Sequence, residues 1–338
     1  MMVIRPVGPE DLDDLERLGI ESGPGMTNLP ADRELLQARI HDSMASFPQE
    51  VTLPGEQVYC FALEDTTSGR VVGTSGIIAT VGTLRPFYSF QLLHLPHTSQ
   101  ELGRFETVPA LQMVNHYRGA TEIGLLYLDP TYRHNGNGRF LSRFRFLMLA
   151  EFPQRFDDLV MAEMRGVGDE KGRSVFWNSL GKRFLHMEFS KADFLSSVGK
   201  YQFIADLMPK YPIYIWLLSR AAQRVIGEPH PHTRPALELL RREGFSFEGL
   251  VDVFDAGPTI HCHREQIRTV MDSRRALVGG IVPRLQAGEH LVAAARLPDF
   301  RVARGPLRPE PDGSITLGHQ LAQTLRVEVG DSCRYVPF

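Results

Sequence analysis

The stretch Arg133-His134-Asn135-Gly136-Asn137-Gly138 decides the fold, because of what stands on either side of it. Before it, residues 123–128 are apolar apart from one glycine, which predicts a buried strand that ends at Asp129-Pro130. After it, residues 140–150 carry apolar side chains at helical spacing. A helix start presents unpaired N–H groups and the positive end of its dipole to an anion, and glycine lets the backbone approach closely. We therefore predict a phosphate-binding loop; an ordinary glycine-rich turn is the alternative.

The spacing Arg-x-x-Gly-x-Gly resembles the pyrophosphate loop of the GNAT acyltransferases, which hold acyl-coenzyme A. It is not a Walker A loop, because no Lys follows the second glycine. The resemblance implies cofactor contacts from the loop and from the backbone of the strand before it. For the strand residues, periodicity alone predicts a core strand. The predicted cofactor-binding residues are Leu125, Leu126, Tyr127, Leu128, Arg133, His134, Asn135, Gly136, Asn137, Gly138 and Arg139.

Composition limits the class of protein. The chain has 338 residues, which favours at least two compact units, and 43% of them are hydrophobic. A net charge of −3 with both signs mixed argues against a nucleic-acid-binding surface. Three scattered cysteines without metal-ligand spacing fit a reduced cytoplasm. The apolar run at 213–218 is far too short to span a membrane, and the first residues do not form a signal peptide.

The pattern of elements predicts an α/β (α+β) fold. Residues 1–195 predict the order β-α-α-β-β-β-α-β-α-β, with an irregular region at 81–119 that contains a strand at 89–95, and a last strand at 185–189. Helices follow at 191–209, 212–226 and 236–243, and short β segments begin near 284. We predict a GNAT-like acyl-coenzyme-A-binding domain at 1–195, an α/β region at 196–280 and a small β-rich unit at 281–338.

Further blocks extend the resemblance along the chain. In order, these blocks are 161–166, 176–184, 192–194, 207–214 and 254–259, and together they resemble the bacterial arginine N-succinyltransferases from the first residues to about residue 275. The resemblance implies transfer of the succinyl group of succinyl-CoA to the α-amine of L-arginine, which gives N2-succinylarginine and CoA. It also implies direct transfer, with succinyl-CoA as co-substrate and no metal or prosthetic group. Members of this family occur as paralogous chains that also act on ornithine.

His230 is the predicted acid/base residue. It lies in Glu228-Pro229-His230-Pro231, where the prolines hold the backbone extended and the imidazole need not pack in a core. The resemblance places the family's proton donor at this position. Either His230 protonates the departing thiolate or it passes on the proton of the amine, and the sequence leaves both roles open.

Arginine as a substrate needs carboxylates for its guanidinium and a cation for its carboxylate. Polar residues inside strand-like apolar segments are the candidates, although structural ion pairs explain such residues equally well. These candidates are Glu163, Arg165, Asp252 and Asp255. For the succinyl carboxylate, Arg165, Lys182 and Arg183 are equivalent candidates.

Three alternatives stay open. Cys262 between His261 and His263 suggests a metal site, but alternation along a strand places the cysteine on the other face, so an ordinary strand end is favoured. The fold can also serve ornithine, another amine or another acyl-CoA, or a chain that binds CoA as the partner subunit of a heteromeric enzyme. Apolar side chains at 196–226 favour a homo-oligomer or a hetero-oligomer with a paralogous chain.

Overall fold

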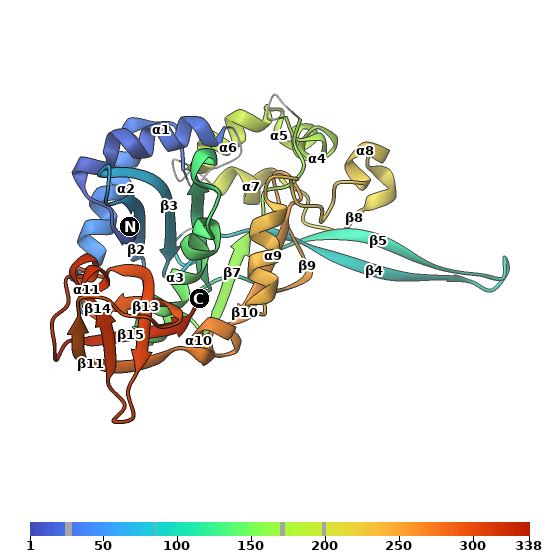
Figure 1. Cartoon of the computed structure of the whole chain (residues 1–338). Helices are drawn as coiled ribbons and strands as arrows, with labels where there is room; N and C mark the ends of the chain where they lie inside the picture. The colour runs from blue at the N-terminus through green and yellow to red at the C-terminus, as the bar shows by residue number, and fades with distance from the viewer. Residues whose placement is uncertain (24–28, 85, 170–172, 198–200) are drawn as a thin grey trace.

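One sheet runs through the computed structural model, which describes residues 1–23, 29–84, 86–169, 173–197 and 201–338 (Figure 1). Its strands are β1 (Met2–Pro6), β2 (Val58–Asp65), β3 (Arg70–Ile78), β4 (Ser89–Ser99), β5 (Arg104–Val114), β6 (Thr121–Leu128), β7 (Leu159–Glu163), β8 (Ile213–Tyr214), β9 (Ser246–Asp252), β10 (Pro258–His263), β11 (Arg274–Val282), β12 (Glu289–Ala294), β13 (Val302–Pro309), β14 (Ile315–Gly318) and β15 (Ser332–Pro337). They are ordered β12-β15-β11-β14-β13-β1-β2-β3-β6-β7-β10-β9-β4-β5-β8.

Helices cover both faces of this sheet. Their bounds are α1 (Leu12–Ser22), α2 (Arg33–Ser46), α3 (Asn137–Glu151), α4 (Val175–Ser179), α5 (Gly181–Leu185), α6 (Phe189–Ser197), α7 (Gln202–Leu207), α8 (Arg220–Gln223), α9 (Arg234–Arg242), α10 (Arg268–Asp272) and α11 (His319–Leu325). Alternation along β2 separates the faces: Phe61 packs with α3, whereas Cys60 and Ala62 pack with α1 and α2. Among the described helices, none is long and apolar enough to cross a bilayer.

A bulge in β6 shapes the centre of the sheet. Ile123 and Leu125 are two residues apart, yet Ile123 packs with α3 and Leu125 packs with α1 and α2. Leu125 has φ 52°, and the register of the β3–β6 pair shifts opposite it, which is the signature of an extra residue in β6. β6 and β7 are parallel and pair only at Thr121 and Glu122, so within the described strands they separate beyond this point.

The C-terminal strands close into a small barrel. β12 pairs with both β13 and β15, and β11 joins β15 to β14, so the five strands form a ring. Buried side chains such as Val292, Leu307 and Ile315 fill it. The predicted β-rich terminal unit is therefore confirmed, and the barrel takes in Arg274 onward. The division into 1–195, 196–280 and 281–338 stays a prediction, since β13 also pairs with β1 of the main sheet.

The region 81–119 is not irregular as predicted, because most of it is a long hairpin. β4 and β5 pair residue for residue from Ser89 with Val114 to Ser99 with Arg104. Figure 1 shows this hairpin projecting from the body of the molecule as an arm. Its prolines and histidines weaken the local strand signal, whereas the pairing depends on the partner strand rather than on local propensity.

Two other predicted elements are wrong. No strand forms at 185–189: α5 ends at Leu185, His186 turns the chain with φ 52°, and α6 begins at Phe189. The helix predicted at 212–226 is replaced by β8, a helical turn and α8, because β8 adds to the exposed edge of β5. The helix predicted at 191–209 is divided between α6 and α7, and residues 198–200 lie outside the described part.

Candidate active site

The loop before α3 has the predicted anion-binding geometry. Asn135 and Gly136 both have positive φ, 51° and 77°, and Gly136 is the residue that caps the start of α3. Glycine offers no side chain to the N–H groups of the first turn. The N–H of Asn137 bonds to the carbonyl of His134, but among the described residues nothing accepts from those of Gly138 and Arg139, so these two remain available to a ligand. Residues 133–136 are exposed. The loop therefore presents a helix N-terminus to solvent, as phosphate binding requires.

Two predicted cations flank this loop. The Nε of Arg133 donates to the carbonyl of Leu128 at 3.0 Å, and its guanidinium lies 5.6 Å from the ring centre of Tyr127. Arg139 lies 4.8 Å from the ring centre of Phe338 at the end of the chain. Both guanidinium groups are held near the helix start, and neither forms an ion pair with a carboxylate among the described residues. Their charge therefore adds to that of the helix dipole.

Sequence reasoning missed Arg304, a third cation at the loop. It comes from β13 of the barrel, donates to the carbonyl of Asn135, and lies 4.7 Å from the ring centre of Phe338. A Cβ at Gly136 would lie 3.1 Å from both Arg304 and Phe338. Nothing in the local sequence indicates this contact, because 169 positions separate Arg304 from Asn135. The barrel therefore contributes to the loop that the glycines define.

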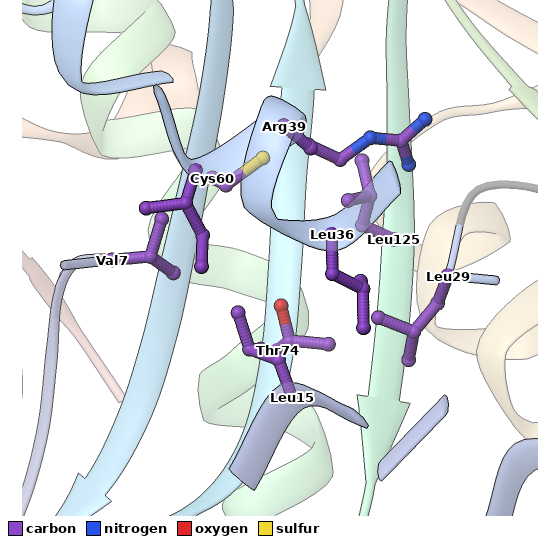
Figure 2. Close-up of a pocket in the computed structure, with 9 residues that line it drawn as sticks. Val7, Leu15, Leu29, Leu36, Arg39, Cys60, Thr74 and Leu125 are labelled. Atoms are coloured by element: carbon purple, nitrogen blue, oxygen red, sulfur yellow. The ribbon is translucent and has the colours of Figure 1, made fainter. Parts of the chain in front are cut away.

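The four predicted residues of β6 differ in exposure. Leu125 and Leu128 are buried, whereas Leu126 and Tyr127 are partly exposed. Because of the bulge, Leu125 lines a small recess between the sheet and α1–α2 (Figure 2). The described part of its wall is formed by Val7, Leu15, Leu29, Leu36, Arg39, Ile40, Cys60, Thr74 and Leu125, and among these described residues only Arg39 is charged.

His230 lies against the segment that follows β7. Its backbone N–H donates to the carbonyl of Arg165 at 2.8 Å, and Pro229 forms an isolated bridge with Gly166. The N–H of His232 donates to Nδ1 of His230 at 3.2 Å, which assigns the proton of the neutral ring to Nε2. Burial lowers the pKa of His230, and the charges of Arg165 and His232 lower it further. The ring is therefore held neutral, with an N–H available on Nε2.

The two aspartates hold the turn beside this segment. Asp255 accepts the backbone N–H of Gly166 at 2.7 Å and that of Gly257 at 2.8 Å. Asp252 accepts from the backbone of Phe254 at 2.7 Å and of Asp255 at 2.8 Å. Both oxygens of Asp255 are therefore engaged by backbone, so this residue positions Gly166 and, through it, the loop that carries the catalytic candidate.

Glu163 differs from both aspartates. It ends β7 and stands opposite Thr259 of β10, and among the described residues no N–H or O–H group donates to its carboxylate. Burial raises the pKa of Glu163 well above its usual range, and the charges of Asp252, Glu122 and Asp255 raise it further. Glu122, which is buried on β6, was not recognised from the sequence. These acids meet only through strand pairing.

The His-Cys-His segment of β10 is part of the strand. The hydroxyl of Tyr117 lies 2.9 Å from Nδ1 of His261, and Cys262 is buried on the opposite face in the core that contains α3. In the part of the chain that the structure describes, no three potential ligands come together as a metal site. Lys182, one of the candidates for the succinyl carboxylate, pairs with Glu188 at the surface of α5.

The bulged strand, the diverging parallel pair and the glycine loop at a helix start define the class of protein: an acyl-coenzyme-A-dependent N-acyltransferase of the GNAT type. The family model described as the arginine N-succinyltransferase beta subunit matches residues 2–269. The model of the C-terminal domain of that subunit matches residues 281–337. The chain therefore belongs to the arginine N-succinyltransferase family, as the sequence blocks predicted.

Individual relatives agree over the full length. An arginine N-succinyltransferase of Escherichia coli (strain 55989 / EAEC) is 42% identical over 339 residues, which cover 99% of this chain and 97% of the relative. One from Yersinia enterocolitica is 41% identical and covers 97% of each chain. The structure of the arginine/ornithine succinyltransferase subunit AI from Pseudomonas aeruginosa superposes with a TM-score of 0.90 at 35% identity, covering 100% of this chain and 98% of that one. The same fold therefore extends through the barrel.

Proposed function

We propose that this chain transfers the succinyl group of succinyl-CoA to the α-amine of L-arginine, giving N2-succinylarginine and CoA. The observation that carries the proposal is membership of the arginine N-succinyltransferase family along almost the whole chain, with the glycine loop and His230 both in place. The loop residues Arg133 to Arg139 hold the pyrophosphate of the co-substrate. The backbone of Leu125 to Leu128 receives the pantetheine arm where β6 separates from β7.

The reaction needs a neutral amine, a polarised carbonyl and a proton for the thiolate. The α-amine nitrogen forms a bond to the thioester carbon, the carbon–sulfur bond breaks, and the proton lost by the nitrogen is balanced by the one gained by the sulfur. The Nε2–H of His230 donates a hydrogen bond to the departing sulfur, and the proton that the sulfur gains is the one that the amine nitrogen loses as the tetrahedral intermediate collapses. The contact of Nδ1 with the N–H of His232 supports this role, since it leaves Nε2 as the donating atom.

We place the succinyl chain next to Leu125, at the edge of this small recess, with Arg39 supplying a cation for the distal carboxylate. Arg39→Gln is expected to lower the preference for succinyl-CoA over acetyl-CoA by about tenfold, measured as the ratio of the two kcat/KM values. Arg33→Gln is the matched control, because Arg33 lies on the same helix and pairs with Asp13 and Glu16 at the surface. An unchanged ratio in Arg39→Gln would contradict this placement.

The function is tested by thiol release from succinyl-CoA and acetyl-CoA, each with L-arginine and L-ornithine. We expect release from succinyl-CoA that depends on arginine, and none with Nα-acetyl-arginine, whose α-amine is blocked. His230→Ala should lower kcat/KM by about 10²- to 10⁴-fold, whereas His232→Ala, the matched neighbour, should stay within a few-fold of wild type. Preference for ornithine would reassign the substrate. Binding of CoA without turnover of any pair would favour the partner-subunit alternative.

Assembly and location complete the proposal. We propose that the chain forms an oligomer, because apolar side chains are exposed on the β4–β5 arm, where Leu102 and Phe105 lie near the tip, and beside its base at Trp216 and Leu217. Light scattering should give a mass of at least two chains, and a fully active monomer would contradict this. The three cysteines, all buried and unpaired, support a reducing compartment such as the cytoplasm.

A further inference from the structure

Four strands bring a set of polar side chains to one face of the sheet. Thr259 of β10 stands opposite Glu163 of β7 and opposite Leu250 of β9. Asp252 follows Leu250 by two positions on β9, and Ser89 of β4 stands opposite Asp252. Residues directly opposed across a strand pair project from the same face, as do residues two apart along a strand. Glu163, Thr259, Asp252 and Ser89 therefore share a face, which we call the acidic face.

The hydroxyl groups on the acidic face are buried without a protein partner. Ser89 is 1% exposed and Thr259 is 0% exposed, and within the described structure neither hydroxyl oxygen makes a hydrogen bond. Buried polar atoms are nearly always paired in native proteins, so two orphans on one face require a partner that the protein itself does not provide. Each hydroxyl sits directly opposite a carboxylate of the set. A ligand that donates several hydrogen bonds satisfies both.

The carboxylates on the acidic face determine the sign of the charge that this ligand must carry. No described residue donates a hydrogen bond to Glu163. One oxygen of Asp252 accepts the backbone N–H groups of Phe254 and Asp255, and the carboxyl of Asp252 is also hydrogen-bonded to the carboxyl of Asp255. A carboxylate offers about four acceptor positions, so Asp252 keeps some in reserve. Glu122 adds a further negative group on the same face, since it stands opposite Met161, two residues before Glu163. A cation is the natural occupant of such a face.

We propose that Glu163 and Asp252, with the hydroxyls of Ser89 and Thr259, bind the guanidinium of the acceptor amino acid. This inference rests on the proposed function and specifies which group of the substrate the acidic face binds. A guanidinium has five N–H donors in a planar fork and no acceptor, so it matches a site built only from acceptors better than a compact ammonium does. Asp255 is not part of the site, because both of its oxygens hold backbone N–H groups.

The position of the acidic face suits the reaction. Val160 and Ala162 of β7 pack with α3, so Glu163 projects from the opposite face, the one on which Leu125 packs with α1 and α2. β6 and β7 separate between these two side chains. A thioester held at the bulge therefore has its acyl chain on the β6 side and the acceptor on the β7 side. The extended side chain of arginine then leads from the α-amine toward Asp252 and Ser89.

The test compares arginine, ornithine and citrulline, the neutral isostere of arginine, in Glu163→Gln and Ser89→Ala. In Glu163→Gln, the KM for arginine should rise by about 10- to 100-fold with kcat within about threefold, and the preference for arginine over citrulline should fall. Ser89→Ala should raise the same KM by about threefold to tenfold. Glu248→Gln is the matched control, because Glu248 is a glutamate on β9, the strand of Asp252, but is 64% exposed and lies beside His261.

Binding measured without turnover separates this inference from the proposed function. Calorimetry of arginine with the CoA-bound protein should show binding in wild type and in Glu248→Gln, and weakened binding in Glu163→Gln. That result in an enzyme that does not succinylate arginine would uphold the acidic face and refute the proposed function. A drop in kcat at unchanged KM in Glu163→Gln would overturn the inference, because Glu163 would then act on the reacting amine. Equal losses for arginine, ornithine and citrulline would overturn it as well.

Discussion

We expect the glycine loop and the acidic face to bind opposite charges by opposite means. The loop is exposed and almost contiguous in sequence, and its donors are backbone N–H groups at the start of α3. The acidic face is assembled from four strands, and its acceptors are side chains, of which the hydroxyls of Ser89 and Thr259 have no hydrogen-bond partner among the described residues. Backbone donors need only glycine and a helix start, whereas side-chain acceptors need strand register. If both proposed sites are right, the co-substrate site is local in sequence, whereas the substrate site depends on the register of the sheet.

The largest expected effect comes from a substitution that disrupts the glycine loop and leaves the acidic face intact. Gly136→Ala forces a Cβ into a left-handed residue, within 3.1 Å of Arg304 and Phe338. We expect the KM for succinyl-CoA to rise by about 10- to 100-fold, with arginine binding by calorimetry unchanged. Gly313→Ala is the control, because Gly313 also has positive φ, 86°, but an added Cβ there meets nothing within 4 Å. Both variants should lose about 1 kcal/mol of stability; if both also lost affinity for succinyl-CoA, strain rather than the loop would be responsible.

A second substitution tests whether the C-terminal barrel contributes to binding of succinyl-CoA at the glycine loop. Arg304→Gln removes the cation that contacts the carbonyl of Asn135, so the KM for succinyl-CoA should rise by about tenfold. Arg308→Gln on the same strand removes an arginine that pairs with Glu310 and should leave both KM values unchanged. Initial rates with each substrate varied in turn provide the measurement. If Arg304→Gln raised the KM for arginine instead, the barrel would contribute to the acceptor site, and this assignment would be contradicted.

Binding at the glycine loop and binding at the acidic face should also depend differently on pH. Burial raises the pKa of both Glu163 and Asp252. The charges of Asp252, Glu122 and Asp255 raise the pKa of Glu163 further, and the charge of Asp255 raises that of Asp252. The empty acidic face therefore holds protons that a bound guanidinium displaces. Arginine binding should tighten as pH rises, by up to about tenfold per pH unit for each proton released. The KM for succinyl-CoA should not follow this trend, and arginine binding that weakened with rising pH would contradict the sign.

The smallest expected effect concerns stability. Because the pKa of Glu163 is higher in the folded than in the unfolded protein, the folded state holds more protons between those two values, and stability falls as pH rises through that window. Glu163→Gln removes this loss, so in the absence of arginine its Tm at about pH 8 should exceed that of wild type by on the order of 2 °C. Near pH 4, below the folded pKa, the difference should shrink. A lower Tm at high pH would indicate that the carboxylate stabilises the fold.

The features that could be predicted from the sequence are the local ones, and those that depend on strand pairing could not be predicted. The strand, the loop and the helix at 123–150 were predictable, because glycines and apolar spacing are local signals. The β4–β5 arm was not, since its strands are stabilised by each other and carry prolines that weaken local propensity. At the site, Glu163 and Asp252 were predicted as polar interruptions of apolar strands. Ser89 and Thr259 were missed, because a buried hydroxyl in a strand is ordinary until the register shows what stands opposite it.

The most direct measurement of the central claim is an initial-rate study in which succinyl-CoA and L-arginine are both varied, for wild type, Gly136→Ala and Glu163→Gln. The two-ended site predicts a crossed pattern: Gly136→Ala raises only the KM for succinyl-CoA, and Glu163→Gln raises only the KM for arginine. If either variant raised both KM values alike, the loop and the acidic face would not be separate sites, and the account would be contradicted.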